Sequence, residues 1–353
     1  MPTALFAWRR TPPPFLVGGA EVTQQLLAEE LAASGWHVTY LGSHEAPWNG
    51  ATQLPGMRAH LVAHRVPYDE EGGALRYQWN GVECAALTQN RVENALGSLL
   101  GALRPDIVFT SQEGSAQIAA RARANALVAG LLHSVSATGL GVLAGRPHYG
   151  LAVSEFVQAR APRAAGTRLA VMYPPFALPG PSTDVARTAS VLMINPIPAK
   201  GSELMHQLIR LMPEQHFTLV EGWWDTATDF AAHPNVTYVP RVYDMRPLYR
   251  SHRLLLVPST VEDAFPRVII EAALHGVPTM GTDRGGIPEA IGDAGIVLPS
   301  TAEAETWVRT IRSADHEALG MRARRRAVRF TRSCLHELRK LGIQADHGGR
   351  ADW

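Results

Sequence analysis

The sequence predicts an α/β protein built from two parallel-sheet domains in tandem. Short apolar runs typical of buried strands alternate with helical segments in both halves of the 353-residue chain. Between the halves lies a segment, 178–190, that is rich in Pro, Gly, Ser and Thr and has no apolar periodicity. We therefore expect domains at 1–177 and 191–325, a linker between them, and a terminal helix over 326–345.

The composition is that of a globular protein. Hydrophobic residues make up 46%, charged residues 18%, and the formal net charge of +1 indicates no nucleic-acid partner. Two distant cysteines, Cys84 and Cys334, suggest neither a disulfide framework nor a cysteine metal site. No apolar run reaches membrane-spanning length, and the start lacks a signal-peptide pattern. We expect a cytoplasmic protein, with peripheral membrane association left open.

The N-terminal half has strand signals at 4–8, 36–41, 106–110, 127–132, 151–154 and 169–173, and helix signals at 20–33, 89–103 and 115–124. Residues 54–88 predict strands and turns, with Asn80-Gly81 as a hairpin signal. Gly18 and Gly19 open the first helix, where backbone amides can meet a phosphate or a sugar. His133 ends a strand. Taken alone, a tight turn and a structural histidine are the better interpretations of these residues.

The C-terminal half has strand signals at 191–194, 217–220, 236–239, 254–257 and 278–281, helix signals at 203–211, 243–249 and 302–313, and an aromatic, acidic loop at 223–225. A basic stretch, 322–332, contains six arginines. It is compatible with nucleic-acid or anionic-membrane binding, but a solvated helix face is favoured.

The segment 254–299 contains the residues whose chemistry is easiest to interpret. A strand ends in an acidic loop with Asp263, and a helix follows with Pro266 in its first turn and Gly276 as its cap. Free amides at such a helix start favour a diphosphate. Asp263 and Glu271 are eight residues apart, about two helical turns, so they could accept hydrogen bonds at the two ends of a sugar–diphosphate–ribose. From spacing alone, a solvated acidic loop remains the better interpretation.

This segment resembles the donor-site signature of the retaining GT-B glycosyltransferases of family 4 (glycosyl transferases group 1). The family pattern is Glu-x-Phe-Gly-x-x-x-x-Glu-Ala, then Gly-x-Pro, then Gly-Gly-x-Pro-Glu. The chain supplies Asp263-Ala264-Phe265-Pro266-Arg267-Val268-Ile269-Ile270-Glu271-Ala272, then Gly276-Val277-Pro278, then Gly285-Gly286-Ile287-Pro288-Glu289. Lys200-Gly201 matches the family's Lys-Gly at the diphosphate, whereas Asn195 stands where the family has Arg and Asp263 where it has Glu.

The resemblance implies a GT-B fold, with two Rossmann-like domains facing each other across a cleft and a terminal helix that crosses back to the N-terminal domain. It implies retaining transfer from a nucleotide-sugar, without a metal or other cofactor, to an acceptor held by the N-terminal domain. His133, Asp263 and Lys200 would be the catalytic residues. The donor-binding residues would be Gly18, Gly19, Asn195, Lys200, Ala264, Phe265, Pro266, Arg267 and Glu271. Without the arginine that Asn195 replaces, phosphate binding should weaken unless Arg246 or Arg267 supplies the charge, and taken singly each of these is better interpreted as a surface arginine.

Several signatures are absent from the sequence: Asp-x-Asp, His-Glu-x-x-His, the Walker loop, Gly-x-Ser-x-Gly and Gly-x-Gly-x-x-Gly. Two alternatives stay open. One is a non-catalytic nucleotide-sugar-binding protein, favoured by Asn195 and Asp263, and the other is a sugar-nucleotide epimerase on the same fold. The sequence names neither the donor base and sugar nor the acceptor, which is a small molecule, a glycan or a lipid.

Overall fold

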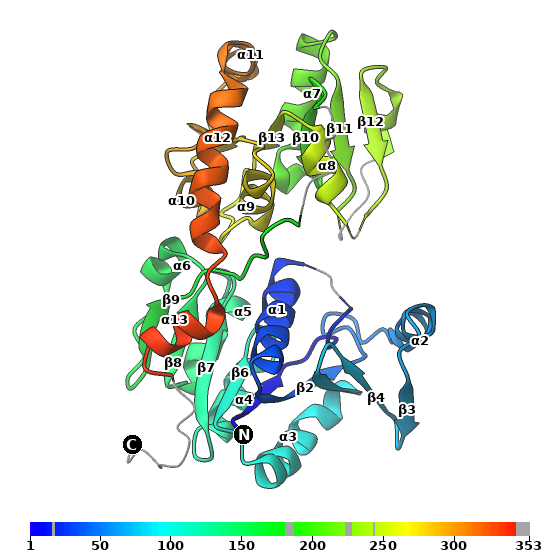
Figure 1. Cartoon of the computed structure of the whole chain (residues 1–353), viewed down its shortest axis with the longest axis vertical. Coiled ribbons are helices and arrows are strands. Elements are labelled where there is room, and N and C mark those ends of the chain that lie inside the picture. The colour runs from blue at the N-terminus through cyan, green and yellow to red at the C-terminus, as the bar shows by residue number, and fades with distance from the viewer. Residues whose placement is uncertain (16–17, 181–186, 223–227, 243, 344–353) are drawn as a thin grey trace. The chain divides into compact units, whose positions relative to one another are not determined.

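The computed structural model describes residues 1–15, 18–180, 187–222, 228–242 and 244–343 (Figure 1). The chain forms two compact units: unit 1 contains Met1–Pro175 and the described residues from Ser333 on, and unit 2 contains Phe176–Arg332. Each unit is an α/β domain with its own sheet. The described parts of the predicted linker, 178–180 and 187–190, are counted with unit 2.

Unit 1 is built on a sheet in the order β3-β4-β5-β2-β1-β6-β7-β8-β9. β3 and β4 pair antiparallel, as do β4 and β5, and the other neighbours are parallel. The strands are β1 Thr3–Ala7, β2 His37–Ser43, β3 Tyr68–Glu71, β4 Ala74–Trp79, β5 Val82–Leu87, β6 Ile107–Thr110, β7 Leu127–Leu132, β8 Tyr149–Ala152 and β9 Arg168–Val171. The connections run in opposite directions from β1 and β6, which makes this pair the topological switch point, where open α/β sheets bind ligands.

The helices of unit 1 are α1 Gly19–Ala33, α2 Leu54–Ala63, α3 Gln89–Leu103, α4 Ser115–Ala122, α5 Ala137–Leu140, α6 Glu155–Arg160 and α13 Cys334–Lys340, with a 3-10 turn η1 at Gly141–Gly145. Aromatic rings stack in the centre of the core: Phe6 on β1 lies 5.2 Å from Tyr40 and 4.7 Å from Phe109, measured between ring centroids. These three rings come from neighbouring strands, so they fix the register on which the edge loops depend.

The prediction for 54–88 was partly wrong. The hairpin between β4 and β5 is present, with positive φ at both Asn80 and Gly81, as a two-residue type I′ turn requires. Residues 54–63, however, form α2 rather than a strand. Met57 and Leu61, four residues apart, are its buried face, and proline in the first turn costs no hydrogen bond.

The C-terminal helix α13 belongs to unit 1. Cys334 and Leu338 are buried in the unit 1 core, and both cysteines are free thiols. Glu30 on α1 accepts hydrogen bonds from the Ser333 hydroxyl and from the Cys334 amide, the latter at 3.0 Å. A carboxylate at the first turn of α13 offsets its unpaired amides. The division between units falls at Ser333, so 326–332, predicted with the terminal helix, stays with unit 2.

Unit 2 has an all-parallel sheet in the order β12-β11-β10-β13-β14-β15, which corresponds to β5-β2-β1-β6-β7-β8 of unit 1. The strands are β10 Val191–Ile194, β11 Phe217–Val220, β12 Val236–Val239, β13 Leu254–Val257, β14 Thr279–Thr282 and β15 Ile296–Leu298. The helices are α7 Ser202–Leu211, α8 Arg246–Ser251, α9 Arg267–Leu274, α10 Ile287–Ile291, α11 Ala304–Ser313 and α12 His316–Ala327, with 3-10 turns η2 Pro198–Lys200, η3 Thr228–Ala232 and η4 Val328–Phe330. The switch point lies between β10 and β13.

The start of one helix in unit 2 differs slightly from the prediction. Pro266 is the N-cap of α9, one residue before the helix, and Gly276, with φ +73°, follows the helix end as predicted. The loop at 223–225 and Tyr243 lie outside the described residues.

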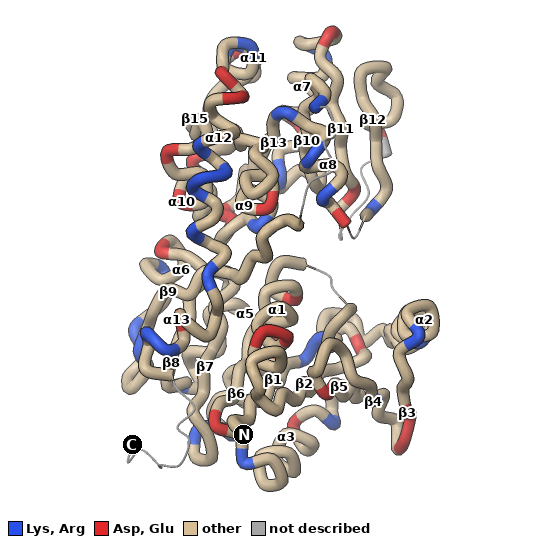
Figure 2. Tube along the Cα trace, viewed as in Figure 1, with Lys and Arg blue, Asp and Glu red and all other residues tan. Residues whose placement is uncertain are grey.

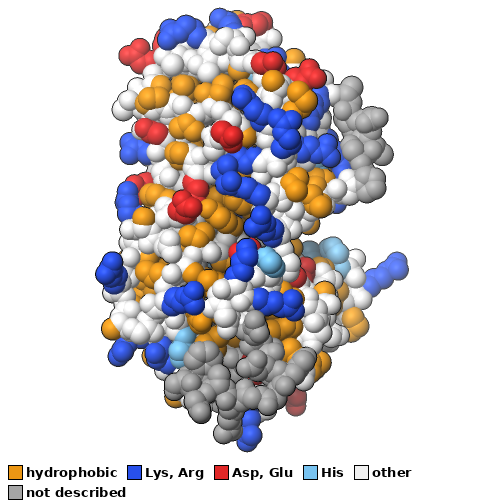
Figure 3. All heavy atoms as spheres, turned by 60° about the vertical axis from the view of Figure 1, so that its left-hand side comes forward, with side chains coloured by type: hydrophobic (Ala, Val, Ile, Leu, Met, Phe, Trp, Pro, Cys, Tyr) orange, Lys and Arg blue, Asp and Glu red, His pale blue; other side chains and the backbone are white. Residues whose placement is uncertain are grey.

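The basic stretch covers the second half of α12, η4 and the two residues after it, and its arginines are blue along the trace in Figure 2. Arg326 is partly buried and donates to the Glu289 carbonyl, whereas the other five arginines are exposed. Leu319, Ala323 and Ala327 form the opposite, buried face. Figure 3 brings this side forward and shows basic side chains interspersed with apolar and uncharged ones. Among the described helices, none is long and apolar enough to cross a membrane.

Candidate active site

The predicted site residues lie at the carboxyl edges of the two sheets. Gly18, Gly19 and His133 belong to unit 1, and all the others belong to unit 2. In each unit, charged side chains pair across the switch point.

In unit 2 the pair is Lys200 and Asp263. Lys200 ends η2 in the loop after β10, and Asp263 lies in the loop after β13. The ammonium group donates directly to the carboxylate, and the two side chains are 29% and 17% exposed. Sequence reasoning assigned these two residues to one site without predicting that they pair. The prediction that Asp263 and Glu271 are separated by about two turns of one helix was wrong, because Asp263 precedes α9.

Tight backbone packing holds the Lys200 loop in place. Gly201 has φ +92°, and a Cβ there would overlap the Pro258 carbonyl oxygen. The Thr260 amide donates to the Ala199 carbonyl at 3.1 Å, and the Ser259 hydroxyl donates to the same oxygen at 3.2 Å. The loops after β10 and β13 therefore form one unit, and only glycine fits at their junction.

The Gly-Gly pair after β14 packs against the Asp263 loop. The Gly286 amide donates to the Asp263 carbonyl oxygen at 2.6 Å. A Cβ at Gly286 would overlap the Ala264 carbonyl oxygen, and one at Gly285 would overlap the Asp263 backbone. These glycines therefore position the loop that carries Asp263.

Glu271, on α9, is held at both carboxylate oxygens. Tyr249 donates its hydroxyl to Oε2 at 3.0 Å, and Arg267 donates Nε to Oε1 at 3.2 Å. Burial, followed by the charge of Glu271, raises the pKa of Tyr249 well above its usual value, so the phenol stays a donor. Arg267 also lies over the Phe176 ring, 4.3 Å from its centroid. Sequence reasoning missed Tyr249, which no motif marks.

The remaining unit 2 residues have clear places. Asn195 follows β10 directly with φ +59°, a conformation that Asn tolerates better than most residues, and its side-chain oxygen is buried without a hydrogen-bond partner among the residues that the structure describes. Phe265 is buried, with its ring 5.5 Å from that of Phe330. Arg246 pairs with Asp244 at 2.7 Å in an exposed contact, which leaves Arg267 as the predicted arginine beside Glu271.

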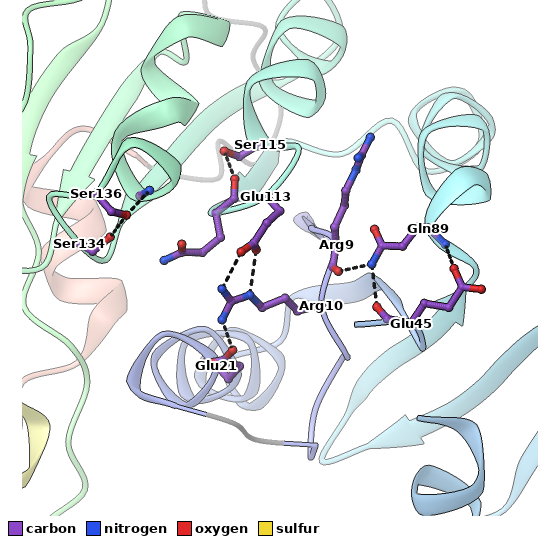
Figure 4. Close-up of polar contacts among 11 residues, drawn as sticks. Arg9, Arg10, Glu21, Glu45, Gln89, Glu113, Ser115, Ser134 and Ser136 are labelled. Atoms are coloured by element: carbon purple, nitrogen blue, oxygen red, sulfur yellow. Dashed lines mark hydrogen bonds and ion pairs between the residues drawn. The ribbon is translucent and has the colours of Figure 1, made fainter. Parts of the chain in front are cut away.

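In unit 1, Gly18 is the extended N-cap of α1 and Gly19 is its first residue. His133 follows β7 directly and is partly buried. Arg10, which sequence reasoning missed, follows β1 and pairs with Glu113 after β6 and with Glu21 on α1 (Figure 4). Unit 1 thus also has an ion pair across its switch point.

A family model described as glycosyl transferases group 1 matches residues 197–314, which include the Lys200 loop, Asp263 and Glu271. No curated relative matches the sequence. Solved structures match nearly the whole chain. Sucrose-phosphate synthase from Thermosynechococcus elongatus has a TM-score of 0.70 at 18% identity, with 97% of this chain and 98% of that chain covered.

The fold is GT-B.

Two further structural neighbours are complexes with UDP and a sugar. HepE from Anabaena, in complex with UDP and glucose, has a TM-score of 0.68 at 18% identity and coverage of 97% and 98%. The pneumococcal O-GlcNAc transferase GtfA, in complex with UDP and GlcNAc, has a TM-score of 0.68 at 11% identity and coverage of 96% and 98%. At these identities the likeness establishes the fold.

Proposed function

We propose that this protein is a glycosyltransferase that moves a sugar from a nucleotide-sugar to an acceptor hydroxyl with retention of anomeric configuration. The observation that carries the proposal is the arrangement at the switch point of unit 2. There Lys200 and Asp263 pair across the two loops, and Glu271 is fixed on the helix that follows. The family-model match spans these three residues and supports the same assignment.

The donor is assigned by its chemistry. Lys200 and the backbone amides of the loops offer positive charge to a diphosphate. Each carboxylate oxygen has about two acceptor positions, so Glu271 retains one per oxygen after binding Tyr249 and Arg267. The two remaining positions suit the hydroxyl pair of a ribose. UDP-sugars are the first donors to test, because the HepE and GtfA structures are complexes with UDP.

In the proposed reaction, the bond between the anomeric carbon and the β-phosphate oxygen breaks while the acceptor oxygen bonds to the same face of that carbon. The acceptor proton passes to the departing phosphate oxygen, so no protein base is needed. Lys200 turns from Asp263 towards the phosphate and stabilises its growing charge, and the released Asp263 accepts a hydrogen bond from the sugar. For unit 1 we propose the roles that the resemblance implies: His133 as a donor to a sugar hydroxyl, and Gly18 and Gly19 as backbone-amide donors at the start of α1.

We infer that transfer needs no metal or other cofactor, because Lys200 and the loop amides supply charge for the diphosphate. The tight packing of the two loops supports this role. The backbone of Lys200 is held at the sheet edge by the close approach of Gly201 to Pro258 and by the hydrogen bond from the Thr260 amide to the Ala199 carbonyl. We further propose a cytoplasmic enzyme, since nucleotide-sugars are intracellular donors.

The experiment is a binding and turnover screen in excess EDTA. The protein is titrated calorimetrically with UDP, GDP, ADP and dTDP, and the corresponding nucleotide-sugars are assayed for release of nucleoside diphosphate. We expect one base to bind and its sugar donor to turn over. If no nucleotide binds, the proposal fails. If binding occurs but turnover needs manganese or magnesium, the metal-free mechanism fails.

A further inference from the structure

A cluster of charged and aromatic side chains surrounds Arg10 at the switch point of unit 1. Arg10 Nε and Nη2 donate to the two carboxylate oxygens of Glu113 at 2.9 and 2.8 Å, and Nη1 donates to Glu21 at 2.6 Å (Figure 4). Burial alone would lower the pKa of Arg10, but the hydrogen bonds and charges of the two glutamates outweigh it and raise the pKa. The guanidinium is therefore permanently charged and is held in one position at the sheet edge by the two carboxylates.

The same guanidinium lies near two indole rings. Its Cζ is 5.9 Å from the centroid of the Trp8 ring and 5.8 Å from that of the Trp48 ring. Trp8 is 1% exposed, whereas Trp48 is 48% exposed. Large aromatic side chains left half in solvent and held in one position are typical of binding surfaces, because they offer contact area at little entropic cost.

The loop that carries Trp48 is braced on both sides. Within it, the Ala46 amide donates to the Ala51 carbonyl at 2.9 Å, and the Gly50 amide donates to the Ala46 carbonyl at 2.8 Å. From α3, the Gln89 side chain donates to the Glu45 carbonyl at 2.7 Å. The backbone that carries the Trp48 indole is thus held by hydrogen bonds within the loop and from α3.

The two halves of this site are close. Trp48 and Glu113 both contact the guanidinium of Arg10, so the centroid of the indole and the carboxylate lie no more than about 10 Å apart. The Glu113 side chain is 29% exposed, and each of its carboxylate oxygens, which accepts one hydrogen bond from Arg10, has a second acceptor position. An apolar ring and a charged acceptor therefore stand within the span of one or two sugar rings.

Charge and polarity decide between ligand classes. Arg10 carries one positive charge against the two carboxylates of Glu21 and Glu113, and the neighbouring Arg9 is paired with Glu93, so an added anion is disfavoured. An acyl chain would desolvate the exposed carboxylate without offering it a hydrogen bond. A pyranose has an apolar C–H face for the indole and hydroxyl donors for the carboxylate.

We propose that Trp48 and Glu113, joined through Arg10, form the acceptor subsite and that the acceptor is an uncharged carbohydrate. The inference rests on the proposed function and narrows its acceptor from a small molecule, glycan or lipid to a sugar. Trp48 packs against the sugar face, and Glu113 accepts a hydrogen bond from a sugar hydroxyl.

The test is saturation-transfer NMR on the full-length protein with methyl glycosides of glucose, galactose, mannose and N-acetylglucosamine, and with maltose, lactose and sucrose. We expect at least one sugar to bind, Trp48→Ala to weaken it roughly tenfold, and Trp48→Phe to retain most of the affinity. Tyr68→Ala is the matched control, because it removes another exposed ring of unit 1, 39% exposed on β3, and should change nothing.

Calorimetry with UDP and the other nucleoside diphosphates runs in parallel on every variant. Nucleotide binding that is unchanged in Trp48→Ala, together with loss of sugar binding, supports the inference. Intact nucleotide binding with no sugar bound, or with sugar binding insensitive to Trp48→Ala, overturns this inference and leaves the proposed function standing. Loss of sugar binding in Tyr68→Ala would also overturn it. Absence of nucleotide binding in the wild type refutes the proposed function separately.

Discussion

Replacing Glu271 tests the ribose end of the proposed donor site. Glu271→Ala removes the two acceptor positions assigned to the ribose hydroxyls. Hydrogen bonds to a charged group contribute about 1.5–3 kcal/mol each, but Glu271 is 31% exposed, so we expect a total loss of about 2 kcal/mol. The Kd of the nucleoside diphosphate should therefore rise about thirtyfold. Glu271→Gln keeps one acceptor oxygen and should raise it by a smaller factor, roughly fivefold to tenfold.

Tyr249 supplies the control for this experiment. In Glu271→Ala the buried Tyr249 hydroxyl loses the hydrogen bond it donates at 3.0 Å, and an unsatisfied buried donor costs about 1–3 kcal/mol of folding free energy. The double variant Glu271→Ala/Tyr249→Phe removes that donor, so it should recover thermal stability without recovering affinity. Tyr249→Phe alone leaves the Arg267 contact and should change nucleotide affinity less than threefold, on the order of 0.6 kcal/mol.

The assay pairs calorimetric titration with thermal unfolding of the three single variants and the double variant. Unchanged nucleotide affinity in folded Glu271→Ala would remove this residue from the donor site. Affinity that returns in the double variant would show that the loss came from disturbed folding and not from a missing contact.

Three further predictions concern the loops and the charge network. Asp263→Ala should lower kcat/KM about tenfold to a hundredfold. Asp263→Glu, whose side chain is longer by about 1.5 Å, should also lower kcat/KM because it misplaces the sugar. An Asp263→Glu variant with unchanged or higher activity would instead indicate that the protein has lost its catalytic function. Gly286→Ala should displace the Asp263 loop and lower kcat/KM more than tenfold, on the order of 1.4 kcal/mol. The control is Gly101→Ala, where a Cβ meets nothing within 4 Å, and this variant should leave the kinetics unchanged without reducing stability. Equal kinetics for the two variants would contradict the packing argument. Burial would raise the pKa of Glu113, but the hydrogen bond and charge of Arg10 outweigh it and lower the pKa below the usual 4.5, so the stabilisation is complete above that value and is lost as the pH falls through the folded pKa. The Tm difference between wild type and Glu113→Gln should therefore be constant above about pH 5 and shrink on acidification; a gap that widens in acid would refute the sign.

Much of the fold was predictable because buried parallel strands are apolar runs. β6, β7, β10, β11 and β13 were each expected to within about a residue. α2 was missed because its apolar residues are few and its helical spacing, seen at Met57 and Leu61, extends over only ten residues.

The site was predictable only where it is local in sequence. Lys200, Asp263 and Glu271 lie in short motifs, whereas the pairing of Lys200 with Asp263 depends on strand order, which brings β10 beside β13. The Arg10 network joins residues from the loop after β1, from α1 and from the loop after β6, with Arg10 and Glu113 103 positions apart. No local pattern marks such contacts, and Tyr249 was missed for the same reason.

The most direct test of the account is the stereochemistry of the sugar released from the donor. Proton NMR follows hydrolysis of an α-linked nucleotide-sugar in EDTA, with water as the acceptor, before the free sugar mutarotates. The account predicts that the first anomer to appear is α, and that Lys200→Ala slows its release at least a hundredfold, about 2.7 kcal/mol. Initial formation of the β anomer would contradict the retaining mechanism at the Lys200–Asp263 switch point.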